Sequence, residues 1–143
     1  MESNKIKFIK REMTKSEFES MKKGFDEYSS EFGNPPLNQK RYTVIVMDDD
    51  KFIGCATGLT NYDNWFYLSD LFIDRKYRKQ GLGSKTLQQL ENKIVKAGFK
   101  HIWTWTAEFE APNFYKKHGY KIFVEMENWY KSGHSRIGLM KDI

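Results

Sequence analysis

The sequence predicts a mixed α/β protein of the α+β kind, in which helices pack on a β-sheet, and three observations lead to this prediction. Residues 65–73 combine aromatic, aliphatic and small side chains without a helical period, as is typical of a central strand. From Leu82 the apolar positions change to the spacing of one helix face. Strands and helices then alternate along 143 residues, and we expect one domain over residues 1–143.

The first elements expected are an edge strand and a helix. Residues 5–12 alternate between two sets of side chains, which favours a strand. Thr14 and Glu17 have the spacing of a capping box, so a helix should begin after Thr14. Its apolar face would consist of Phe18, Met21, Phe25 and Tyr28. The glycine and two prolines of residues 33–36 should end this helix.

A hairpin should follow, and then the central strand. Residues 42–47 and 52–60 favour strands, and the polar residues 48–51 between them favour a tight turn. The central strand should lead through a basic turn into the helix that begins at Leu82. Gly98 is placed to cap the end of that helix.

The last third should add a strand, a short helix and two closing strands. Residues 99–106 alternate between two faces and predict a strand. A short helix should follow, because Pro112 suits a first turn and Gly119 suits a helix end. Residues 120–126 and 135–140 are expected to form the closing strands.

The basic turn before Leu82 is a candidate anion site. Gly81 and Gly83 allow the backbone to pass close to a ligand, and the first amides of the helix are unpaired. These amides, the helix dipole and the cations Arg75, Arg78 and Lys79 suit a phosphate or pyrophosphate. An ordinary solvated turn remains the alternative. The pattern is neither the dinucleotide-binding fingerprint, which has a third glycine, nor a Walker loop.

Composition favours a cytoplasmic protein without a metal. No run of about 18 apolar residues could span a membrane, and no charged-then-apolar leader opens the sequence. The single Cys55 excludes an internal disulfide. The net charge of +5 is spread along the chain, which argues against nucleic acid as a partner. Three scattered histidines and three adjacent aspartates lack the spacing of zinc or calcium ligands.

Two local motifs lie about 30 residues apart, with a strand between them. The first is Arg78-x-x-Gly81-x-Gly83, and the second, in residues 111–120, has the form Ala-x-x-Phe-Tyr-x-x-x-Gly-Tyr. Together with the order of elements, they resemble the Gcn5-related N-acetyltransferase (GNAT) superfamily over nearly the whole chain. The first is similar to the superfamily's acetyl-CoA pyrophosphate loop, and the second to a segment of its fourth helix.

The resemblance implies a mixed, mostly antiparallel sheet of about seven strands, with three to four helices packed on both faces. Two departures stand out. Glu108 occupies a position where many relatives have asparagine, which puts that contact with the cofactor in doubt. Ser69 and Asp70 occupy the place of a Glu-Asp pair in diamine and polyamine acetyltransferases, so the similarity to those enzymes is partial.

The resemblance also implies acetyl-CoA as the cofactor. The central strand would pair with its pantetheine arm, and the basic turn would hold its diphosphate. The implied cofactor-binding residues are Leu71, Phe72, Ile73, Arg78, Lys79, Gln80, Gly81, Leu82, Gly83, Ser84 and Asn113.

Two side chains are candidates for catalysis. An alkyl amine titrates near pH 10 and needs a proton acceptor at neutral pH, a role for which Asp70 is the candidate. A structural carboxylate, or one that orients a cationic substrate, is the alternative. Tyr115 resembles the superfamily's general acid, which protonates the departing CoA. A phenol near 10 and a thiol near 8.5 are close enough for this transfer. A half-buried aromatic that anchors the short helix is the alternative.

We therefore expect an N-acetyltransferase that moves acetyl from acetyl-CoA to a primary amine by direct attack in a ternary complex. The acceptor, a small-molecule or protein amine, stays open, and a homodimer is common in the superfamily. His134 and four glutamates are expected near the acceptor end, with a solvated surface as the alternative. The glutamates are Glu108, Glu110, Glu125 and Glu127.

Two other functions stay open, a catalytically weak acyl-CoA-binding sensor and a basic nucleic-acid-binding module. An acyltransferase is expected to bury most of Trp65, Trp103 and Trp105. A stacking protein would instead expose them beside a cationic groove. Neither nucleic acid nor a membrane is expected as a partner.

Overall fold

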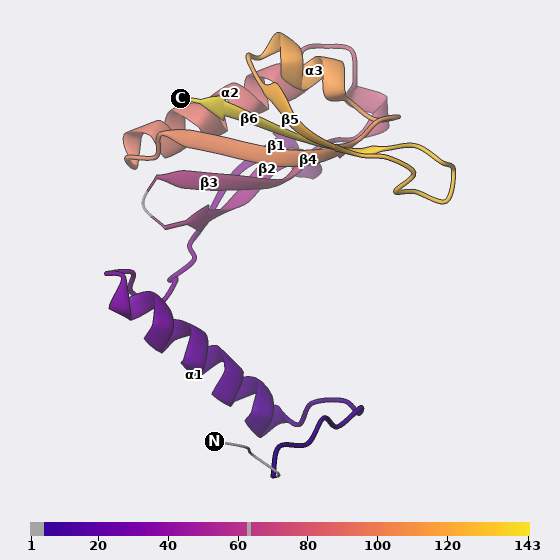
Figure 1. The fold of residues 1–143 in the computed structure, drawn as a ribbon. Helices are drawn as coiled ribbons and strands as arrows, with labels where there is room; N and C mark the ends of the chain where they lie inside the picture. The colour runs from indigo at the N-terminus through magenta and orange to yellow at the C-terminus, as the bar shows by residue number, and fades with distance from the viewer. Residues whose placement is uncertain (1–4, 63) are drawn as a thin grey trace. The chain divides into compact units, whose positions relative to one another are not determined.

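The computed structural model describes residues 5–62 and 64–143, which fall into two units. One unit extends to Leu37, and the other is Asn38–Ile143 (Figure 1). Among the described residues, no helix combines the length and the apolar character needed to cross a membrane.

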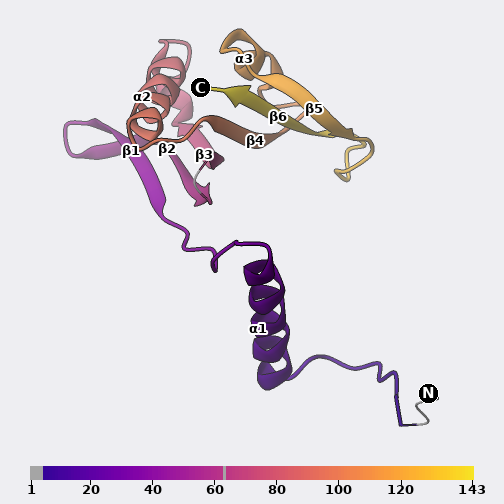
Figure 2. The same cartoon turned by 60° about the vertical axis from the view of Figure 1, so that its left-hand side comes forward.

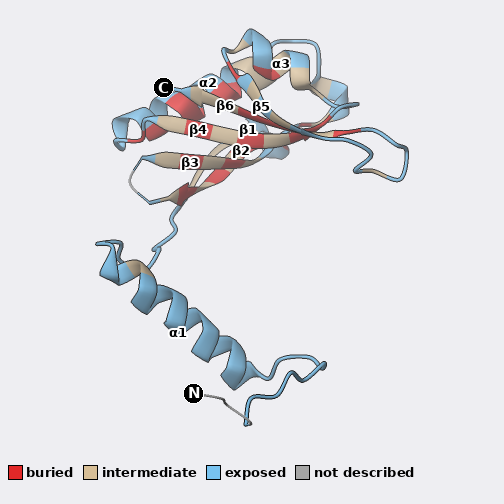
Figure 3. Cartoon of the chain, in the orientation of Figure 1, coloured by how far each residue is buried: buried red, intermediate tan, exposed pale blue. Residues whose placement is uncertain are grey.

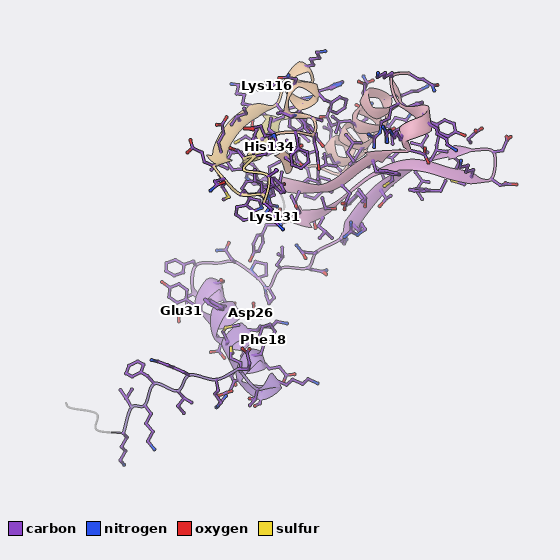
Figure 4. The ribbon with its side chains drawn as sticks, turned by 90° about the vertical axis from the view of Figure 1, so that its right-hand side faces the viewer. Phe18, Asp26, Glu31, Lys116, Lys131 and His134 are labelled. Carbon is purple, nitrogen blue, oxygen red and sulfur yellow. The ribbon has the colours of Figure 1, made fainter. Side chains whose placement is uncertain are left out.

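The described residues of the first unit form one helix, α1 (Lys15–Glu31), and its capping box is confirmed. The Glu17 amide donates to Thr14 Oγ1 at 3.1 Å, and the Thr14 amide donates to Glu17 Oε1 at 2.8 Å. The Arg11 guanidinium also bonds this carboxylate and, together with the cap, lowers the pKa of Glu17 to about 2. Figure 4 labels Phe18 near the start of α1 and Glu31 at its end.

The strand expected over residues 5–12 is wrong, since these residues form neither helix nor strand. A strand is stabilised by the backbone of a partner strand. The described part of this unit holds no second strand with which residues 5–12 could pair.

The second unit contains a six-stranded sheet with the strand order β1-β2-β3-β4-β6-β5. All neighbours are antiparallel except β3 and β4, which are parallel, so the predicted mixed α/β class is confirmed with six strands rather than about seven. The strands are β1 (Arg41–Asp48), β2 (Lys51–Asn61), β3 (Trp65–Ile73), β4 (His101–Ala107), β5 (Lys121–Met126) and β6 (Arg136–Asp142). A 3-10 turn η1 (Arg75–Tyr77) precedes α2 (Leu82–Lys96), and α3 (Pro112–Lys117) follows β4.

Helices α2 and α3 lie against the same face of this sheet (Figure 1, Figure 2). One buried cluster joins side chains of α2, such as Leu87 and Ile94, with Tyr115 of α3 and with Phe66 and Ile102 of the strands. Figure 3 shows the buried residues gathered in the strands and on the side of α2 that meets them. This core fixes the two helices that carry the two sequence motifs.

The opposite face of the sheet carries a row of aromatic rings. Trp65 stacks on His101 at 4.4 Å between centroids, and Tyr67 lies 4.5 Å from Trp103. The expectation that Trp65, Trp103 and Trp105 are buried is wrong, because all three are half-buried. They point away from the face that α2 and α3 cover, so they are packed mainly against one another and against neighbouring rings.

Candidate functional site

The site begins where the two parallel strands separate. Strands β3 and β4 pair over four residues of each, from Trp65 with His101 to Leu68 with Thr104. Beyond Leu68, the described part of β3 pairs with β2 alone. The strands thereby leave an opening between the end of β3 and the end of β4, and backbone groups of β3 face this opening.

A β-bulge in β3 lies at the point of separation. Thr57 of β2 pairs with Asp70 and Gly58 pairs with Leu68, so Ser69 is the extra residue. The Ser69 hydroxyl donates to the Thr57 carbonyl at 3.1 Å, which holds the bulge in place. The strand predicted over residues 65–73 had no bulge, although the adjacent polar residues Ser69 and Asp70 interrupt the alternation that precedes them.

The turn before α2 has the open backbone that an anion requires. Gly81 is the N-cap of α2, with φ of +78° and no side-chain capping bond, so the first amides of the helix are left to a ligand. A Cβ added at Gly81 would meet no atom within 4 Å. At Gly83 the nearest atoms belong to Phe114 at 3.7 Å. No described side chain fills the cradle.

This cradle opens into a cleft of about 610 Å³. Nine of the expected cofactor-binding residues line it: Leu71, Phe72, Ile73, Arg78, Lys79, Gly81, Leu82, Gly83 and Ser84. Gln80 and Asn113 are exposed and line neither this cleft nor the cavity beside it. The cleft is also lined by Tyr77, Phe109 and Phe114, none of which was among the cofactor-binding residues expected from the sequence.

A smaller cavity of about 190 Å³ holds both catalytic candidates, Asp70 and Tyr115. Four residues line both hollows, so the cavity adjoins the cleft. They are Leu71, Glu110, Ala111 and Phe114. Asp70 is exposed at this cavity, and Glu110 adds a second carboxylate to its lining. The other walls come from β4 through Thr104, Trp105 and Thr106.

Burial dominates the electrostatics of Tyr115. It raises the pKa of the phenol to about 12, although the neighbouring Thr104 hydroxyl opposes the shift. The negative charges of Glu110 and Asp70 raise it further. Tyr115 therefore keeps its proton at neutral pH and can donate a hydrogen bond into the cavity.

The loop between β5 and β6 lies beside the wall of the cleft that Phe109 forms. It carries Lys131 and His134, both labelled in Figure 4. His134 is exposed and lines neither the cleft nor the cavity, but its ring lies 5.3 Å from Phe109 of the cleft wall. Of the glutamates expected near the acceptor end, Glu110 lies at the cavity, whereas Glu108, Glu125 and Glu127 line neither hollow.

Comparison with known proteins gives consistent matches. The family model for the acetyltransferase (GNAT) family matches residues 7–120. The uncharacterized N-acetyltransferase YjcF of Bacillus subtilis (strain 168) is 27% identical over 106 residues, which cover 74% of each chain. A crystal structure of an acetyltransferase from Bacillus cereus ATCC 14579 superposes with a TM-score of 0.81 and 26% identity, covering 96% of this chain and 98% of that one.

A more distant structure shares the fold. It is a GNAT family acetyltransferase from Elizabethkingia anophelis with acetyl-CoA bound. It matches with a TM-score of 0.64 and 16% identity, covering 85% of this chain and 82% of that one.

Proposed function

The chain belongs to the acetyltransferase (GNAT) family and is an acetyl-CoA-dependent N-acetyltransferase, and from this premise we propose that it acetylates a primary amine directly, within a ternary complex. The observation that carries the proposal is the junction of the two hollows. The open backbone cradle leads into the larger one, and Asp70 and Tyr115 share the smaller one. Both substrates can therefore be held at once.

The chain's own residues suit the cofactor. Because no described side chain occupies the space beside Gly81, the amides of the first turn of α2 are available to a diphosphate. Arg78 and Lys79 at the rim add positive charge. Leu71, Phe72 and Ile73 would line the path of the pantetheine arm. When bound, acetyl-CoA supplies an acetyl group activated as a thioester.

Asp70 is placed to receive the acceptor. Its carboxylate is exposed at the small cavity, where it can attract an ammonium group and accept a proton from it, directly or through water. Glu110 strengthens this attraction from the same cavity. Two carboxylates beside the reaction site favour a cationic amine over a neutral acceptor.

Tyr115 would act on the departing sulfur as a hydrogen-bond donor. Complete proton transfer from a phenol with a pKa of about 12 to a thiolate that titrates near 8.5 is uphill by roughly 5 kcal/mol. Donation without transfer avoids this cost and still stabilises the developing negative charge. The sequence predicted that Tyr115 transfers its proton completely as a general acid, and we now propose that it only donates a hydrogen bond.

Calorimetry and a thiol assay test the proposal together. Acetyl-CoA should bind at one saturable site in the wild-type protein, and Gly83→Trp should abolish the heat, because the indole would occupy the cradle. A panel of primary amines should then release free CoA thiol in proportion to acetylated product. Saturable binding without thiol release from any amine would identify an acyl-CoA sensor and contradict the proposal.

A further inference from the structure

Arg136 lies against two indole rings, one of which, Trp105, lines the small cavity. Its guanidinium carbon lies 4.6 Å from the ring centre of Trp105 and 5.0 Å from that of Trp129. We propose that Arg136 binds a carboxylate of the acceptor, which makes the preferred acceptor a zwitterion of the amino-acid kind, with an amine and a carboxylate in one small molecule. This inference rests on the proposed function and specifies its substrate class.

The charge of Arg136 has no partner in the part of the chain that the structure describes. The ion pairs found there involve other cations, and none brings a carboxylate within 4.0 Å of this half-buried guanidinium. The guanidinium lies over both the Trp105 ring and the Trp129 ring, within the range of cation–π attraction. A planar guanidinium can bind a carboxylate through two parallel hydrogen bonds.

Trp105 links Arg136 to the catalytic cavity. Trp105 lines the same cavity as Asp70 and Tyr115. Arg136 also pairs with Ala107 at the end of β4, next to the segment that brings Glu110 to the cavity. The cavity thus offers negative charge to an ammonium group, and Arg136, which lines neither hollow itself, lies against Trp105 of the cavity wall.

The loop that supplies Trp129 is fixed by its contacts. Phe109 of the cleft wall packs against Tyr130 with ring centres 5.2 Å apart. The Tyr130 amide donates to the His134 carbonyl at 3.1 Å, and the Glu108 amide donates to the Ser135 carbonyl at 2.9 Å. Arg136 is therefore presented by a preformed wall, so a carboxylate can bind it with little ordering cost.

The test compares matched acceptors. For several amino acids, the acid, its carboxamide and its decarboxylated amine are assayed, for example lysine, lysinamide and cadaverine. Each is also titrated by calorimetry into the CoA-bound protein, which gives a readout independent of turnover. The acid should exceed its carboxamide by about tenfold or more in kcat/KM and in affinity, as expected for hydrogen bonds to charged groups.

Variants assign this preference to Arg136. Arg136→Gln should bring acid and carboxamide within about twofold of each other, and Arg136→Lys should retain part of the difference. Lys131→Gln removes a charge from the neighbouring loop and should change nothing. Thermal melting and acetyl-CoA binding check that every variant is folded.

Two outcomes overturn the inference. One is an equal response to acid and carboxamide in the wild-type protein, including no response to either. The other is a preference that survives Arg136→Gln. If carboxamides and decarboxylated amines release CoA thiol as fast as the acids do, the acetyltransferase function stands and this specificity falls. If no amine releases CoA thiol but the acid binds through Arg136, carboxylate binding by Arg136 stands and the proposed acetyl transfer to an amine falls.

Discussion

Ser84 Oγ and His118 Nε2 lie 2.9 Å apart, so the first turn of α2 is bonded directly to the C-cap of α3. Ser84 lines the cofactor cleft, and the residue three positions before His118 is Tyr115. Phe114 packs on the His118 ring at 4.7 Å between centroids and lines both hollows. This bond couples the position of the anion cradle to that of the proposed hydrogen-bond donor.

Removing this bond should weaken cofactor binding. In His118→Ala, the α2–α3 contact loses a hydrogen bond and the packing of Phe114, so we expect the Kd for acetyl-CoA to rise several-fold and stability to fall by about 1 kcal/mol. Calorimetry and urea unfolding measure the two effects. Lys117→Ala, at the neighbouring position, is the matched control. Unchanged affinity in His118→Ala would show that the contact has no part in the site.

Tyr115→Phe should lower kcat by roughly tenfold to a hundredfold with little change in the Kd of acetyl-CoA, because it removes one donor to a developing charge. The dependence of the rate on pH follows from the raised pKa of Tyr115. Since the pKa is raised to about 12, the neutral, donating form persists throughout pH 6–10. In the wild-type protein the rate should therefore rise as the amine loses its proton, without a decline from Tyr115 below pH 10. A decline in the wild type that disappears in Tyr115→Phe would refute this assignment.

Gly58→Ala should destabilise the protein through the bulge. An added Cβ would collide with the Tyr67 carbonyl oxygen and would lie 2.5 Å from the Phe66 ring. Removing this collision requires β3 to move at the bulge. We therefore expect the free energy of unfolding, measured in urea, to fall by about 1–3 kcal/mol, and the activity to be lower. Gly24→Ala is the control, because nothing lies within 4 Å of its added methyl group. Equal stability of Gly58→Ala and the wild type would contradict the bulge geometry.

Glu91 is a buried residue of α2, and its carboxylate depends on its partners. Lys141 donates to it at 3.0 Å and 3.2 Å, and the Tyr120 hydroxyl donates at 2.7 Å. Lys141→Met leaves this charge without its cation and should cost about 2–3 kcal/mol in chemical unfolding. The double variant Glu91→Leu/Lys141→Met should recover part of that loss, because no unpaired charge remains. An additive result for the two substitutions would rule out coupling between them.

Local chemistry made much of the fold predictable. The capping box at Thr14, the change of period at Leu82 and the glycines after helix ends each act within a few residues, and the structure places helices accordingly. Most of the residues implied by the two motifs also gather in one place, because the motifs lie on adjacent helices over one sheet face.

The failures concern contacts that are distant in sequence. Residues 5–12 alternate like a strand, but alternation cannot supply the partner that a strand requires. The same limit explains Trp103 and Trp105, because alternation shows that they share one face of the strand but not whether that face is covered. The roles of Phe109 and Trp129 depend on how two loops meet, which sequence spacing does not encode.

Initial-rate kinetics with both substrates varied test the central claim most directly. Direct transfer in a ternary complex predicts double-reciprocal lines that intersect, and Cys55→Ala should keep the same pattern because no residue carries the acetyl group. Parallel lines, together with a protein that retains acetyl after removal of acetyl-CoA, would contradict the account.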